Sequence, residues 1–116
     1  MPQSTTPLVS YKPSAYYFRT GLRGAKTRAD AEAVIRVVAS EQRCLTMWVR
    51  AKGLMPPATE QASAAKNSKA AVIEHGLSAV NQLEDLKTWV RAQGLIPPKF
   101  AVLAIEAKAK GWTGAA

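Results

Sequence analysis

One stretch of this chain occurs twice. Residues 45–57 read LTMWVRAKGLMPP and residues 86–98 read LKTWVRAQGLIPP, so nine of thirteen positions are identical at a spacing of 41 residues. Chance does not plausibly produce this agreement in a chain of 116 residues. A repeat at a fixed spacing indicates two copies of one supersecondary unit.

Each copy carries the signals of a helix that ends in a sharp turn. In the first copy, Trp48 anchors the helix and Gly53 supplies the left-handed residue that ends it. Leu54 can then fold back onto Val49, which is the contact of a Schellman motif. A proline pair follows, which prevents continuation and lets the second proline open the next helix. We therefore expect a duplicated helix–Gly–Leu–X–Pro–Pro–helix corner.

The spacing of apolar residues predicts an all-α fold, a small bundle of four or five short helices. Residues 27–116 should form one helical domain with two related halves, about 30–70 and 71–112. The expected helix boundaries are a start at Thr27–Asp30, an alanine-rich helix over residues 58–70, an end at Gly76, a capping box led by Asn81, and a last helix from Phe100 to Gly111.

The N-terminal residues 1–26 are expected to form an extended basic arm. Residues 1–29 contain five basic residues and no acidic one, whereas residues 30–116 contain eleven basic and eight acidic residues. Prolines at positions 2, 7 and 13 favour extended backbone. The aromatic residues of this arm either stack on bases or pack on the body or on a neighbouring subunit.

The net charge of +8 favours a polyanionic partner, most often nucleic acid. A solubilising tail is the alternative explanation of the basic arm. No apolar run reaches the roughly 18 residues that span a bilayer, so no membrane partner is expected. With one cysteine and one histidine, we expect no metal, no cofactor and no enzymatic activity.

The string Trp-Val-Arg-Ala-Gln-Gly-Leu-Ile-Pro-Pro, followed by Ala-Ile-Glu at 104–106, resembles the end of a helix-turn-helix in Cro-like and antitoxin-like phage repressors. The resemblance covers residues 83–111 and, more loosely, residues 33–57. It implies a recognition helix in the major groove. Where that family has a glycine and an apolar residue at the turn, this chain has Ala39-Ser40 and Val80-Asn81. An uninterrupted helix from about Asp30 to Lys52 is therefore the open alternative.

The candidate nucleic-acid-binding residues come from three sources. The arm supplies basic groups for phosphates, the resemblance implies groove-facing side chains, and the two corners supply one arginine each. Arg50 and Arg91 either complement the helix C-terminus or clamp phosphates at equivalent places. The full set is Lys12, Arg19, Arg23, Lys26, Arg28, Gln42, Arg43, Thr46, Arg50, Lys87 and Arg91.

These observations predict a small nucleic-acid-binding protein, with DNA favoured over RNA as its partner. The leading interpretation is a helix-turn-helix-like regulator in the cytoplasm or associated with the nucleoid. The alternatives are a structural or assembly protein of a phage particle or ribonucleoprotein, and a phage-encoded inhibitor that binds a host protein. An assembly protein would form homo-oligomers or larger assemblies and would neutralise nucleic acid without reading its sequence.

Overall fold

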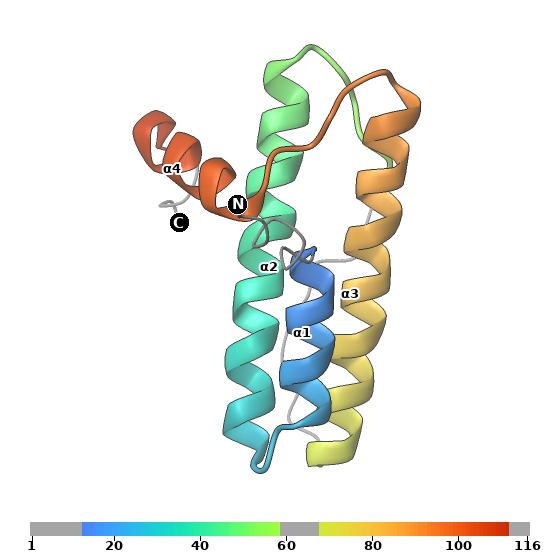
Figure 1. Ribbon diagram of the computed structural model, residues 1–116, viewed down its shortest axis with the longest axis vertical. Coiled ribbons are helices and arrows are strands. Elements are labelled where there is room, and N and C mark those ends of the chain that lie inside the picture. Colours follow the sequence, from blue (N-terminus) through green and yellow to red (C-terminus); the bar gives the residue numbers. More distant parts are fainter. Residues whose placement is uncertain (1–12, 59–67, 112–116) are drawn as a thin grey trace, which may run out of the picture.

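The described residues form four helices, in a fold that the sequence predicts to be all-α. The computed structural model describes residues 13–58 and 68–111. They form α1 (Ser14–Arg23), α2 (Arg28–Ala51), α3 (Lys69–Ala92) and α4 (Phe100–Lys110), with no strand among the described residues (Figure 1). Two of these helices are 24 residues long rather than short. None of the four combines the length and the apolarity needed to cross a bilayer.

The starts of the two long helices are fixed by hydroxyl caps. Thr27 Oγ1 accepts a hydrogen bond from the backbone N–H of Asp30 at 3.1 Å, and Asp30 Oδ2 accepts one from the N–H of Thr27 at 3.1 Å. This capping box confirms the predicted start of α2. Ser68 caps α3, where its Oγ accepts from the N–H of Ala71 at 3.2 Å.

The two long helices obey the same spacing of 41 residues as the repeated sequence. We call two residues equivalent when they are 41 positions apart; the bounds of α2 and α3 are equivalent at both ends. The seven buried positions of α3 are 72, 76, 79, 80, 83, 86 and 90, and all seven equivalent positions of α2 are buried as well. The structural repeat therefore extends well beyond the thirteen residues of clear identity.

Helices α2 and α3 lie side by side and run in the same direction (Figure 1). A hydrogen bond joins one member of each buried set: Gln42 Nε2 on α2 donates to the carbonyl oxygen of Ala79 on α3 at 3.5 Å. Parallel helices that meet in this way are related by roughly a half-turn about an axis that runs between them. Equivalent residues outside the shared interface therefore face opposite sides of the bundle.

Residues 14–23 are helical, so the prediction of an extended arm is wrong for this part. They form α1, which runs antiparallel to α2 and α3 and packs against both (Figure 1). Its apolar residues Ala15, Phe18 and Leu22 have helical spacing and are buried. Pro13 is compatible with this helix because it occupies the N-cap, where a missing N–H costs nothing. Residues 1–12, with Lys12, lie outside the described residues.

Gly76 and Asn81 do not mark helix ends, contrary to the predictions for them. Both lie inside α3, which runs unbroken from Lys69 to Ala92. The boundary expected between residues 70 and 71 also falls inside this helix. Gly76 is there because α1 and α2 approach closely: an added Cβ would come within 2.7 Å of Leu22 Cδ2. The helix expected over residues 58–70 lies largely outside the described residues.

The last helix packs on one flank of α2. α4 begins at Phe100, as predicted, and ends at Gly111, which has a left-handed φ of 75°. Its Leu103 and Ala107 are buried. On α2 itself Trp48 is buried, whereas the equivalent Trp89 of α3 is only half-buried.

Candidate nucleic-acid interface

The two repeated corners have the same backbone geometry. Gly53 and Gly94 have φ angles of 86° and 85°. The N–H of Leu54 donates to the carbonyl of Val49 at 3.3 Å, and the equivalent bond from Leu95 to Val90 also measures 3.3 Å. Each glycine N–H donates at 2.9 Å to the carbonyl of the arginine three residues before it. These are the hydrogen bonds of the Schellman motif.

After each corner the chain crosses toward the other long helix (Figure 1), and a groove lies beside each corner. The first corner groove lies between α2 and the segment after it, and has a volume of about 590 Å³. Its lining consists of Gln42, Arg43, Thr46, Met47, Arg50, Met55, Pro56, Pro57 and Ala58. Within the described residues, no acidic side chain lines it.

The second corner groove lies at the equivalent place on α3 and has a volume of about 530 Å³. It is lined by Pro13, Ser14, Tyr17, Lys87, Arg91, Pro97, Pro98, Lys99, Phe100 and Ala101. The start of α1 forms one of its walls. Arg50 and Arg91 are equivalent, exposed, and line the first and second groove respectively.

Gln42 does not face a DNA groove, which corrects its predicted role. Only 4% of its surface is exposed, and its amide donates to the carbonyl of Ala79 on α3. Thr46 is half-buried, and its hydroxyl donates to the carbonyl of Gln42 at 2.8 Å. Of the three residues that the resemblance places in the first recognition helix, only Arg43 is fully exposed. α2 also runs through the position of the expected turn without interruption.

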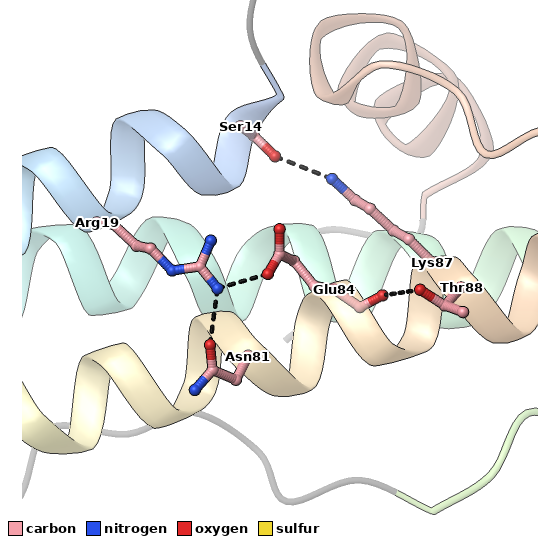
Figure 2. Close-up of polar contacts among 6 residues, drawn as sticks. All are labelled: Ser14, Arg19, Asn81, Glu84, Lys87 and Thr88. Atoms are coloured by element: carbon pink, nitrogen blue, oxygen red, sulfur yellow. Dashed lines mark hydrogen bonds and ion pairs between the residues drawn. The ribbon is translucent and has the colours of Figure 1, made fainter.

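Lys87 is a structural cation and is not available to DNA. Its Nζ lies 2.8 Å from Glu41 Oε2 and donates to Ser14 Oγ at 3.0 Å, as Figure 2 shows for the serine. Ser14 Oγ in turn donates to Glu41 Oε1 at 2.8 Å. Glu41 is 0% exposed, so this ion pair lies away from solvent. The three residues join α1, α2 and α3.

Arg19 is likewise committed within the protein. Its guanidinium donates to Asn81 Oδ1 at 2.7 Å and to the carboxylate of Glu84 (Figure 2). The hydrogen bond from Arg19 lowers the pKa of Glu84 below its ordinary value, against the opposing effect of partial burial. The same bond raises the pKa of Arg19. Arg28 is also paired, with its Nε 2.8 Å from Glu32 Oε2.

Apart from Arg91 on α3, the remaining predicted cations within the described residues fall into two groups at opposite ends of α2. Arg23 and Lys26 lie exposed beside the start of α2, where Lys69 Nζ reaches the carbonyl of Lys26 at 3.5 Å. Arg43 and Arg50 lie toward the corner. At 1.5 Å per residue, the two ends of α2 are roughly 35 Å apart. The predicted residues therefore do not form a single surface.

Arg36 was missed by the sequence analysis. It lies seven residues before Arg43, which lies seven before Arg50, so the three are in one column along α2. All three are exposed, and none forms an ion pair within the described part of the chain. We call them the arginine column. The seven-residue spacing of these arginines is visible in the sequence and could have identified Arg36.

Comparison with protein families, with curated proteins and with solved structures gave no match. Across residues 13–58 and 68–111, no group of three histidine, cysteine or acidic residues is placed to hold a metal ion. The candidate site therefore rests on charge and shape alone: two grooves, the arginine column beside the first, and Arg91 with Lys99 at the second.

Proposed function

We propose that this protein binds nucleic acid by holding backbone phosphates at its two corner grooves. The observation that carries the proposal is the pair Arg50 and Arg91, which are equivalent, exposed and placed at grooves of similar volume. A guanidinium presents a planar set of donors that matches a phosphate. DNA is the partner we expect first.

The corner end is favoured over the opposite end of α2 because of its local charge. Near the start of α2, Asp30 and Glu32 lie among the cations, and Glu32 pairs with Arg28. The first corner groove has no acidic lining among the described residues. The arginine column then continues the positive surface along α2, at steps of about 10.5 Å.

Contact with phosphates rather than with base edges is favoured by the continuous helices. α2 and α3 each span 24 residues without a turn, and Gln42 is buried. A helix-turn-helix regulator needs a separate recognition helix whose side chains reach the bases. Binding that ignores base sequence is what an assembly or packaging protein requires, so this alternative gains support.

The proposal is tested by titrating a short DNA duplex at several salt concentrations. Each phosphate contact contributes roughly −0.9 to the slope of log affinity against log salt. Replacing the arginine column (R36Q, R43Q and R50Q together) should make the slope about 2.7 less steep. The matched control (R23Q, K26Q and K69Q) removes the same charge at the opposite end of α2. A larger loss in the control would place the site there and refute the corner grooves.

A selection from random duplexes separates the two forms of the proposal. We expect no enriched sequence, because the described contacts involve only phosphates. Enrichment of one site by several kcal/mol, in the range of about 4–10 that specific binders show, would instead identify a sequence-reading regulator.

A further inference from the structure

The second corner groove differs from the first in the chemistry of its walls. Tyr17 and Phe100 bring two aromatic rings to it, whereas the described residues that line the first groove include methionines and no aromatic residue. The rings come from the first turns of α1 and α4, so residues far apart in the sequence meet here. Pro97 and Pro98 add rigid apolar surface between them.

Cations occupy another part of the same groove. Arg91 lies in the last turn of α3, and Lys99 precedes α4; both are exposed and line the groove. Lys87 also lines it, but its ammonium is held by Glu41 and Ser14 and fixes the start of α1 against α3. The groove thus combines an aromatic and proline surface with the exposed side chains of Arg91 and Lys99.

We infer that the second corner groove binds one unpaired nucleotide of a single strand, with its base against Tyr17 and Phe100 and its phosphate on Arg91 and Lys99. This inference rests on the proposed function and names the form of nucleic acid that this groove takes. A volume of about 530 Å³ lies within the roughly 300–1,000 Å³ of small-ligand pockets. Stacking of a base on an aromatic side chain contributes about 1–3 kcal/mol.

Tyr16 gives a matched control for Tyr17. The two rings are in edge-on contact with centroids 5.2 Å apart, and they are 47% and 55% exposed. Only Tyr17 lines the groove. Since both are exposed, neither Tyr16→Ala nor Tyr17→Ala should disturb the fold, which far-ultraviolet circular dichroism checks. Arg50→Gln is the matched control for Arg91→Gln, because the two arginines are equivalent and, among the described lining residues, only the groove of Arg91 has aromatic rings.

The experiment measures binding of the full chain to an oligothymidylate of about twelve nucleotides and to a duplex. We expect Tyr17→Ala to weaken oligothymidylate binding about tenfold, to leave duplex binding unchanged, and to be rescued by Tyr17→Phe. Tyr16→Ala should change neither. Arg91→Gln should weaken binding of the oligonucleotide more than Arg50→Gln does. Thymidine monophosphate, as competitor, shows whether a free nucleotide suffices or a strand is required.

Equal effects of Tyr16→Ala and Tyr17→Ala on oligothymidylate binding, or no effect of either, would overturn the inference. The proposed function would still stand in that case if duplex binding remained dependent on salt. Absence of binding to both nucleic acids would refute the proposed function and the inference with it. Loss of duplex binding in the arginine-column variant with an intact Tyr17 effect would show that the two grooves act separately, as inferred.

Discussion

The backbone of Gly76 on α3 lies against the side chain of Leu22 on α1. A Cβ atom built on Gly76 would come within 2.7 Å of Leu22 Cδ2 and 3.1 Å of Ile35 Cγ1. Three helices therefore meet at one residue, and they can do so because that residue has no side chain. Leu22 and Ile35 are 0% and 1% exposed, so neither can move without displacing its neighbours.

Gly76→Ala should lower the free energy of unfolding by roughly 1 kcal/mol, measured by urea denaturation. Overpacking costs about 1–3 kcal/mol, and the better helix propensity of alanine returns about 1 kcal/mol. In a Leu22→Ala background the space is open, so Gly76→Ala should there be neutral or stabilising. An identical loss in both backgrounds would show that the close approach is not the cause.

Lys87→Met should destabilise the fold by about 3 kcal/mol or more, because it leaves the buried carboxylate of Glu41 without its cation. Adding Glu41→Gln should recover part of this loss, since the unpaired charge is then removed. Thermal unfolding of the two single variants and the double variant measures the coupling. Strictly additive losses would mean that the pair does not interact.

Glu84 should make stability depend on pH in the acidic range. Its pKa is lowered by Arg19, so the stabilisation is present above the unfolded-state pKa, about 4.3, and is lost as pH falls through the folded-state value. The pair is partly exposed, with 43% of the Glu84 side chain accessible. We therefore expect its contribution to the free energy of unfolding to be below about 1 kcal/mol. The difference in unfolding free energy between the native protein and Glu84→Gln should therefore shrink toward zero as the pH falls below the folded-state pKa of Glu84.

Cys44 should resist thiol reagents in the native protein. It is 0% exposed, and burial raises the pKa of its thiol, with a smaller opposing contribution from Ser40. We expect reaction with an aromatic disulfide at pH 8 to proceed no faster than opening of the fold, and to become rapid in urea. Fast reaction of the folded chain would show that the core around Cys44 opens readily.

The corners were predictable because their determinants are local. A glycine at C′, a leucine at C″ and two prolines specify the turn within five residues, and both turns follow. The start of α2 at Thr27 is local in the same way. Gly76 misled because a glycine within a helix looks the same in sequence as one that ends it. What distinguishes them is the approach of Leu22, which depends on the tertiary arrangement.

The candidate site was predictable only for side chains whose exposure follows from their own helix. Arg43, Arg50 and Arg91 are exposed on their helices, and the spacing could have added Arg36. Gln42 and Lys87 could not be placed, because their burial and pairing depend on neighbouring helices. The second groove could not be foreseen at all, since it requires Tyr17 and Phe100 to converge from opposite ends of the chain.

The near half-turn that relates α2 to α3 determines how the two corner grooves are arranged on one molecule. Arg50 and Arg91 line equivalent grooves on two helices related in this way, so under the proposed function a straight duplex laid along one broad side would contact only one of the two grooves. If both grooves bind as proposed, one molecule would hold two separate lengths of nucleic acid about one bundle's thickness apart.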